Sequence, residues 1–279
     1  MIKKYEFTDE TTEVDGHTLH RIRAVRCFSD VKAGDLGGWI EKEHNLSHED
    51  HAWVYDEVKV YGDAQVIDDA IVWGCAKVYD NALIEGRARV YNHAQVYNDA
   101  SVSRNAEVGG NAMVYGNAVV YGNALVCGNA KVYDFCYISD EAQVSNDAVV
   151  YGDASVFGGA LVGDQAKVHG NVYIYGNARI AGTAQVYGNA NISGGTKIVG
   201  DADVCGHADY ITFKNFWSSG IYFTWTRSNN MWSVGCFYGT GDELIKEAYN
   251  DSEKSGREYE RVVRYVESIL EDEKKGGEG

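Results

Sequence analysis

A repeat of six residues runs without insertion through a little over half of this chain. Stepping by six from Ala52 to Ala208 gives 27 positions, of which 23 are alanine. The exceptions are Val58, Cys136, Val172 and Thr196. Two residues after each of the first 26 positions stands Val or Ile, and two residues later Gly, Asp or Asn, except at Arg104. This regularity constrains the architecture more than any other feature.

Each repeat predicts one short strand and one corner. Residues i and i+2 of a strand point to the same side, so the Ala and the Val or Ile both face inward. Gly, Asp and Asn tolerate the positive φ of a tight bend. A flat sheet cannot absorb a corner in every repeat, whereas a coil can. The repeat therefore predicts a parallel β-helix.

A longer period indicates how many sides the coil has. The residue after each Val or Ile, read in every third repeat, forms one nearly uniform series, here called the Tyr ladder: Tyr61, Tyr79, Tyr97, Tyr115, Tyr133, Tyr151, His169 and Tyr187. The other two series are mixed. Three sides per turn explain this, so the 27 repeats predict about nine coils and a rod of roughly 40 Å.

The pattern resembles the hexapeptide repeat of left-handed parallel β-helices, in which a small residue follows four positions after an aliphatic one. The resemblance covers residues 52–208. It implies a three-sided, left-handed coil. This chain departs from the family where it often has Tyr directly after the aliphatic residue.

We expect three parts: an N-terminal β cap (1–51), the hexapeptide-repeat β-helix (52–208) and a small aromatic-rich α+β domain (209–279). The ends of a β-helix expose strand edges, which need capping. In the first part we expect strands at 4–8 and 18–28 and an irregular first coil at 34–47. Ile40 and Leu46 are one repeat apart but two residues out of frame with Val54.

The last part differs from the repeat. Strands are expected at 221–226 and 231–238, around a turn at 227–230. Helices are expected at 242–250, capped by Asp242, and at 256–273, capped by Ser255, with a frayed tail at 274–279. The whole layout, and this end above all, resembles uncharacterised β-helical proteins of bacteriophages and prophages. That resemblance implies a phage accessory protein in the bacterial cytoplasm.

Composition excludes several function classes. The formal net charge is −16, which disfavours general DNA or RNA binding. No apolar run is long enough for a membrane span. The six cysteines are scattered without a CxxC pair, which suits a reducing compartment. No acid pair, metal-ligand cluster or nucleophile–base motif stands out, so we expect no cofactor, no metal and no catalytic residue.

The Tyr ladder is the first candidate site. Stacked aromatic side chains on successive strands stabilise a rod, and this role alone would explain them. Contiguous exposed aromatic residues also mark contact surfaces. On that hypothesis the ladder is an interface, and we expect a homo-oligomer, with a trimer favoured by the resemblance to the wider family.

The aromatic C-terminal part is the second candidate site. Six residues would form a ligand pocket there: Lys214, Trp217, Trp225, Arg227, Trp232 and Arg257. Aromatic faces hold a planar base, and Arg binds phosphate. The alternative is that the rings form the core of the domain. The strand pattern places Arg227 on the core face, where it needs an acid or a ligand as partner.

The leading hypothesis is a non-enzymatic binding protein with a rigid rod and a C-terminal recognition domain. Its partner would be a host protein or a small nucleotide, as in a counter-defence protein. The second hypothesis is a hexapeptide-repeat acyltransferase. Against it, residues 52–208 contain no extruded loop, and His93, His169 and His207 occupy ordinary repeat positions. The third hypothesis is a structural, virion-associated protein.

Overall fold

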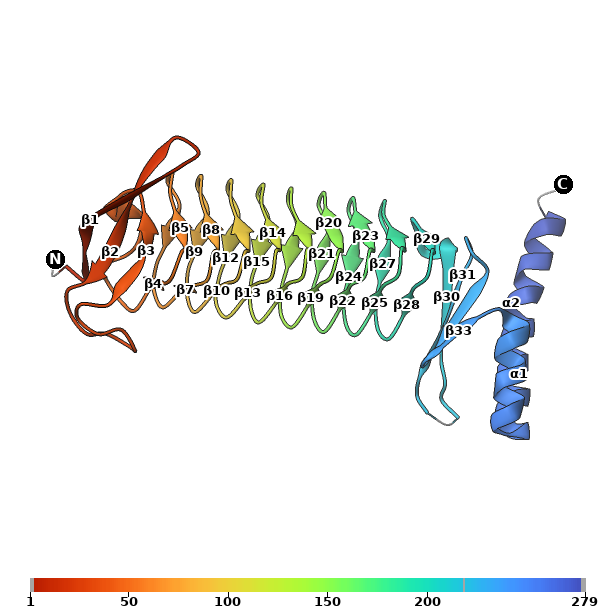
Figure 1. Ribbon diagram of the computed structural model, residues 1–279. Helices are drawn as coiled ribbons and strands as arrows, with labels where there is room; N and C mark the ends of the chain where they lie inside the picture. Colours follow the sequence, from red (N-terminus) through yellow and green to blue (C-terminus); the bar gives the residue numbers. More distant parts are fainter. Residues whose placement is uncertain (1–2, 218, 277–279) are drawn as a thin grey trace.

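The protein is a straight three-sided β-helix with a β cap at one end and a small α+β unit at the other (Figure 1). It is described here from a computed structural model, which covers residues 3–217 and 219–276. The coil makes about nine turns, and each side is a parallel sheet. The β-helix predicted from the repeat, with its cap and its C-terminal α+β part, is confirmed.

The three faces are named in the order in which the repeat, from residue 52 onward, enters them. The first face contains β4 (Trp53–Val54), β7 (Ile71–Val72), β10 (Arg89–Val90), β13 (Glu107–Val108), β16 (Leu125–Val126), β19 (Gln143–Val144), β22 (Leu161–Val162), β25 (Arg179–Ile180) and β28 (Lys197–Ile198). The second face contains β5 (Lys59–Val60), β8 (Lys77–Val78), β11 (Gln95–Val96), β14 (Met113–Val114), β17 (Lys131–Val132), β20 (Val149–Tyr151), β23 (Lys167–His169), β26 (Gln185–Val186) and β29 (Asp203–Val204). The third face contains β6 (Gln65–Val66), β9 (Leu83–Ile84), β12 (Ser101–Val102), β15 (Val119–Val120), β18 (Tyr137–Ile138), β21 (Ser155–Val156), β24 (Tyr173–Ile174) and β27 (Asn191–Ile192).

The repeated Ala and Val or Ile side chains fill the interior of the coil. Ala112 and Val114 are fully buried, as are their equivalents in the neighbouring repeats. Each strand pairs in parallel with the strand three repeats later, for example Val96 with Val114. Burial of this continuous apolar column stabilises the rod, at roughly 25 cal/mol for each Å² removed from water.

The corners adopt the left-handed backbone conformation that the Gly, Asp and Asn positions predict. Gly128 has φ +73° and Asp56 has φ +49°. Where the corner residue is Asp, its carboxylate also bonds to the next coil: Asp56 Oδ2 accepts a 3.0 Å hydrogen bond from the backbone N–H of Gly74. The same residue type therefore shapes the bend and ties successive coils together.

The N-terminal cap consists of β1 (Tyr5–Val14), β2 (His17–Ala24), β3 (Leu36–Ile40) and the short 3₁₀ helix η1 (Glu43–Asn45). The turn between β1 and β2 lies at Asp15-Gly16, as predicted, but both strands differ in extent from the expected ranges. β3 pairs in parallel with β5, Ile40 beside Val60. The first coil, from Ile40 to Val60, is therefore longer than three repeats. This extra length explains why Ile40 is out of frame with the repeat.

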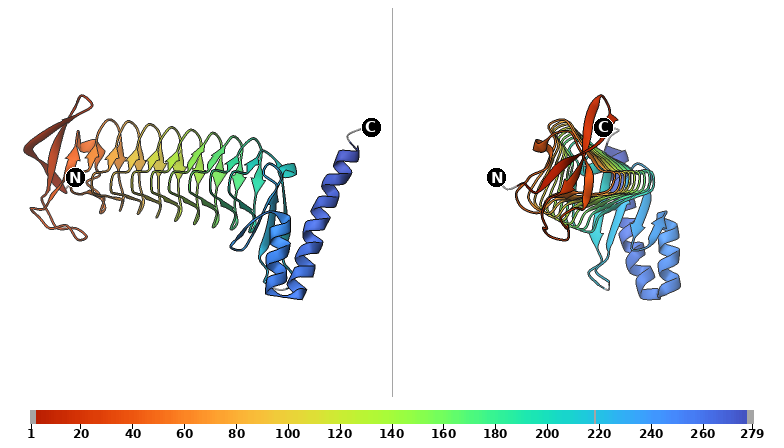
Figure 2. Two further views of the ribbon diagram at one scale, coloured as in Figure 1. Left: turned by 45° about the vertical axis from the view of Figure 1, so that its right-hand side comes forward. Right: turned by 60° about the vertical axis from the view of Figure 1, so that its left-hand side comes forward.

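The C-terminal unit is a four-stranded antiparallel sheet with two helices. After η2 (His207–Asp209) come β30 (Tyr210–Lys214), β31 (Tyr222–Thr226), β32 (Met231–Val234) and β33 (Phe237–Gly239), then α1 (Gly241–Asp251) and α2 (Glu253–Gly276). One side of the sheet lies on the last coil, where Thr224 Oγ1 accepts a 3.0 Å hydrogen bond from Lys197 N. The other side packs on the helices, so β31 is buried on both sides (Figure 2).

Several local predictions for this unit were wrong. The run 231–238 is split into two strands, because Gly235 turns the chain with φ +58°. The N-cap of α1 is Thr240, whose hydroxyl accepts from Glu243 N, and not Asp242. The second helix begins at Glu253, so Ser255 lies inside it. Residues 274–276 of the predicted frayed tail belong to the second helix, and 277–279 lie outside the described residues.

Candidate functional site

The Tyr ladder forms one continuous stack along the corner between the second and third faces. Neighbouring ring centroids are 4.7 to 5.3 Å apart from Tyr61 to Tyr187, with interplanar angles of 16° or less. The rings from Tyr79 onward are half-buried. Each ring covers the face of the next, so the stack presents mainly ring edges and hydroxyl groups to solvent. Whether the ladder is also an interface stays a prediction.

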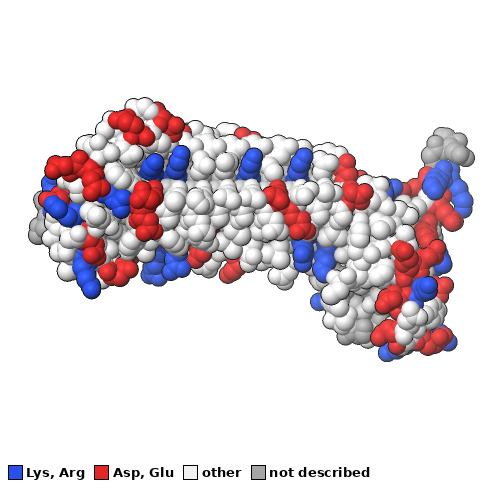
Figure 3. Space-filling model, viewed as in Figure 1, with Lys and Arg blue, Asp and Glu red and all other residues white. Residues whose placement is uncertain are grey.

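The ladder borders a part of the rod that carries few charges. Residues 108–130 contain no charged residue, although the chain has a net charge of −16. In the view of Figure 3 the middle of the rod is mostly white, with charged side chains concentrated toward the two ends. Phe135, Tyr137 and Tyr173 are 65%, 41% and 49% exposed on or beside the third face.

Among the six residues predicted to bind a ligand, the tryptophans lie in or against the core of the C-terminal unit. Trp225 and Trp232 face each other on adjacent strands and are 2% exposed. The indole N–H of Trp225 donates to Asn230 Oδ1 at 2.9 Å. Trp217 is partly buried against Phe223. The three rings thus contribute to packing, which was the alternative reading of this segment.

The cations among the six have partners within the chain or lie at the surface. Arg227 forms a two-pronged ion pair with Glu273, at 2.9 and 3.2 Å, and its Nε donates to Ala208 O. Its expected partner is therefore an acid of α2. Arg257 is exposed and pairs with Glu253 one helical turn away, and exposed Lys214 lies over the Tyr222 ring. The role of these six as a ligand site stays a prediction.

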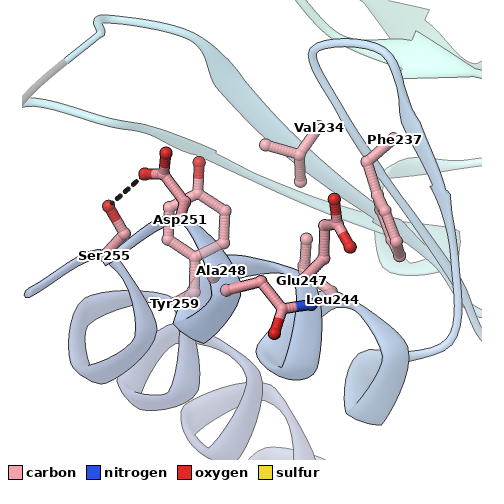
Figure 4. Close-up of a pocket in the computed structure, with 9 residues that line it drawn as sticks. Val234, Phe237, Leu244, Glu247, Ala248, Asp251, Ser255 and Tyr259 are labelled. Carbon is pink, nitrogen blue, oxygen red and sulfur yellow. Dashed lines mark hydrogen bonds between the residues drawn. The ribbon is translucent and has the colours of Figure 1, made fainter. Parts of the chain in front are cut away.

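A cavity of about 350 Å³ opens on the C-terminal unit between the sheet and the two helices (Figure 4). Its apolar walls come from Val234, Phe237, Leu244, Ala248 and Tyr259. Glu247 and Asp251 supply carboxylates, and Asp251 accepts a 2.9 Å hydrogen bond from Ser255 Oγ. No Lys or Arg is among the described residues that line it. None of the six predicted residues lines this cavity.

A second cavity, of about 300 Å³, lies at the opposite end of the rod and was not predicted. It forms where the loop 25–35 between β2 and β3 meets the first face. Its lining consists of Ser29, Asp30, His51, Tyr55, Asp69, Ile71, Arg87 and Arg89. His51, Asp69 and Arg87 occupy equivalent positions in successive coils, which is a sequence signal for a column on one corner. No pattern in the sequence predicted where the loop 25–35 lies.

The loop over this second cavity is held by packing against the first coil. Val31 is 3% exposed and pairs with Phe28 through two backbone hydrogen bonds. The Phe28 ring packs edge-on against Trp53, with centroids 5.3 Å apart. Asp30 accepts a 2.9 Å hydrogen bond from the Tyr55 hydroxyl, and burial with this carboxylate raises the pKa of Tyr55. The loop therefore has a defined place on the rod.

The histidines considered as catalytic residues for acyl transfer lie at the ordinary repeat positions that the sequence predicts. His169 is stacked between Tyr151 and Tyr187 in the ladder. His93 is exposed on a corner, and His207 begins η2. His51 is differently placed, because its Nδ1 lies 2.8 Å from Asp69 Oδ1 in the second cavity.

Two features are absent from residues 3–217 and 219–276. No group of three or more His, Cys, Asp or Glu side chains in this part of the chain is placed to hold a metal ion. Neither α1 nor α2 combines the length and the apolar character that crossing a membrane requires.

Known proteins resemble this chain in its repeat. Residues 106–122 match the family model described as the YdcK beta solenoid repeat. A stretch of 64 residues is 36% identical to a protein of Escherichia coli (strain K12) named "Uncharacterized acetyltransferase YdcK". That stretch covers 20% of this chain and 20% of the Escherichia coli protein, so the chain matches about a fifth of its relative's length. The comparisons thus support a β-helix repeat protein similar to YdcK.

Proposed function

We propose that this protein is a non-catalytic binding protein whose rod carries a recognition domain at its C-terminal end. In this proposal the cavity between the sheet and the helices receives a basic side chain of a partner protein. The observation that carries it is the composition of that cavity: apolar walls, two carboxylates, and no Lys or Arg among its described lining residues.

A lysine or arginine side chain matches this composition. Its stem is apolar and packs on rings and aliphatic groups, while its charged end needs an acid or water. Glu247 and Asp251 are placed to supply the acid. A nucleotide phosphate would face two carboxylates without a compensating cation, which costs free energy. For this cavity we therefore favour a protein partner over a nucleotide signal.

The attachment of the domain to the rod supports its use as a fixed recognition head. The Lys197 ammonium donates to Gly235 O at 2.6 Å, Asp203 N donates to Ser228 Oγ at 2.7 Å, and Asn229 bonds Asp201. These contacts join several loops of the domain to the last coil. If copies associate through the Tyr ladder, their cavities are presented together, and avidity exceeds the affinity of one site.

The wider proposal is that the partner is a bacterial host factor and that its capture counters a host defence. The resemblance of the chain's end to phage-encoded proteins suggests this context. The discriminating first step is a pull-down from bacterial cytoplasm, with mass spectrometry of captured proteins and of released small molecules. On this proposal a protein is recovered by the wild type and lost with Glu247→Gln.

A direct test uses defined peptides rather than an unknown partner. Fluorescent peptides of equal length, one rich in Lys and Trp and one in Glu and Trp, are titrated with the purified full chain by anisotropy. We expect the basic peptide to bind with an affinity that falls as salt rises, and the acidic peptide not to bind. Glu247→Gln should weaken binding several-fold.

The matched control is Asp272→Asn, an exposed acid on α2 that does not line the cavity. It removes the same charge from the same domain, so it separates cavity recognition from general attraction to an acidic protein. Equal losses in Glu247→Gln and Asp272→Asn, or equal binding of both peptides, would overturn the proposal.

A second candidate function is acyl transfer, favoured by the similarity to a protein named as an acetyltransferase and by the His51–Asp69 contact. A carboxylate accepts only, so the 2.8 Å contact places the proton on His51 Nδ1 and leaves Nε2 as a base. Incubation with acetyl-CoA should then raise the melting temperature, and His51→Asn should abolish transfer to an amine or hydroxyl acceptor. An unchanged melting temperature would remove this candidate.

A further inference from the structure

The cavity between the loop 25–35 and the first face contains two guanidinium groups whose donors are largely free. Arg87 makes no ion pair among the described residues, although the chain contains 41 acidic residues. Arg89 has a single contact, from Nη1 to Glu107 at 3.1 Å. Each guanidinium has five N–H donors in a fixed fork. An acidic chain thus keeps a pair of arginines available at one place.

The two acids of the cavity already have partners. Asp30 accepts from the Tyr55 hydroxyl at 2.9 Å, and Asp69 lies 2.8 Å from His51. Asp69 also occupies the position one coil before Arg87, yet the two do not form an ion pair. The cavity therefore has a cationic part, at Arg87 and Arg89, and a part that offers carboxylate acceptors.

We propose that this cavity binds a small polyol phosphate, such as a sugar phosphate, with the phosphate on Arg87 and Arg89. The planar forks of two arginines match the oxygens of a phosphate monoester. The ligand's hydroxyl groups donate to the remaining lone pairs of Asp30 and Asp69. Ile71 and the Tyr55 ring supply the apolar contact that the carbon skeleton needs. A volume of about 300 Å³ lies at the lower end of the range for small-molecule sites.

The acids select against larger phosphate ligands. A polyphosphate or a nucleic acid backbone would bring several negative charges to a cavity that holds Asp30 and Asp69, and to a chain of net charge −16. A single phosphate with neutral hydroxyl groups avoids that repulsion. This site lies at the far end of the rod from the proposed recognition cavity and does not depend on it.

The test is calorimetric titration of the full chain with glucose 6-phosphate, inorganic phosphate and glucose. Glucose 6-phosphate should bind saturably and more tightly than inorganic phosphate, and glucose should give no saturable heat. Arg87→Gln and Arg89→Gln should each lower the affinity for both phosphates at least tenfold. Both side chains are exposed, so the variants should melt at the wild-type temperature.

Arg104→Gln is the matched control, because Arg104 lies on the corner one coil after Gly86, over the Tyr121 ring, and does not line the cavity. It should bind both phosphates as the wild type does, and so should Glu247→Gln. The proposal fails if neither phosphate binds saturably, or if Arg87→Gln binds them as well as Arg104→Gln. Failure of the wild-type chain to bind the basic peptide, with phosphate binding retained, would count against the proposed recognition cavity alone.

Discussion

The hydroxyl of Tyr61 donates a 2.9 Å hydrogen bond to Asp15 Oδ2, at the tip of the β1–β2 hairpin. Tyr61 is the first ring of the Tyr ladder and is 3% exposed. The His17 ring lies against it, with centroids 5.1 Å apart. The ladder therefore ends on the N-terminal cap, and the cap is attached to the coil partly through the ladder.

Tyr61→Phe tests this attachment because it removes only the hydroxyl. A hydrogen bond to a carboxylate contributes about 1.5–3 kcal/mol, and less where the acceptor regains water, so we expect a loss of about 1 kcal/mol. The loss should appear as faster amide exchange in β1 and β2, with unchanged exchange in the middle coils. Tyr97→Phe, in the interior of the ladder, is the control and should leave exchange of the cap unchanged.

The ladder should also make stability fall at alkaline pH. Burial, helped by Tyr97 and Asp80, raises the pKa of Tyr79 to about 12, and burial likewise raises the pKa of Tyr97 and Tyr115. An unfolded Tyr titrates near pH 10. A raised folded pKa gives stability that is complete below about pH 10 and is lost as pH rises through about 12. Tyrosinate absorbance and melting temperature, followed together across this alkaline range, check this; Tyr79→Phe should reduce the decline.

The repeat predicted the coil because every repeat carries the same information. Ala112 and Val114 fill the interior and Gly116 forms a corner, and the equivalent residues do the same along the rod. The modulation in every third repeat indicated the three faces, and the shifted frame of Ile40 indicated an irregular first coil. A fold in which each unit contacts only its neighbours leaves few alternatives.

The C-terminal unit was harder to predict because single residues decide its geometry. Thr240 and Asp242 are both suitable N-caps, and Glu243, three residues after Thr240, decides between them through a reciprocal capping box. Thr224 lies between the buried Phe223 and Trp225 and is buried as well. The last coil covers its side of the sheet, and no local pattern records that contact.

The cavity at the N-terminal end depends on a tertiary contact of an irregular loop. Asp30 reaches Tyr55 only because Phe28 and Val31 pack against the first coil. Strand and turn patterns do not encode where such a loop lies. The column of His51, Asp69 and Arg87 was visible in the repeat, whereas the loop that completes the cavity was not.

The corner at Gly128 allows a test of the backbone rule. Its φ is +73°, and an added Cβ would lie 2.7 Å from Asn146 N. Asn98 and Asn146 adopt the same conformation elsewhere on the rod, so the strain in Gly128→Asn comes mainly from the contact of its Cβ with Asn146 N, and the variant should cost about 1–2 kcal/mol. Gly128→Val should cost about 2 kcal/mol or more, since a branched side chain is strained at positive φ. Urea unfolding of both variants measures the difference; equal costs would contradict a conformational cause.

The proposed interface role of the Tyr ladder can be separated from its packing role. Tyr97 and Tyr115 stack at 4.8 Å in the middle of the rod, beside its uncharged part. If the ladder is an interface, light scattering should give a mass near three times 30.7 kDa for the wild type. The double variant Tyr97→Ser, Tyr115→Ser should then be monomeric, and it should also melt earlier, because each aromatic pair contributes about 0.5–1.5 kcal/mol beyond its area.

Tyr91→Ser is the matched control for this experiment. Tyr91 stacks on Trp73 with centroids 4.7 Å apart, on the corner between the first and second faces and outside the ladder. It should lose stability and keep the mass of the wild type. A wild-type monomer, or a double variant that melts earlier at an unchanged mass, would leave the ladder with its packing role alone.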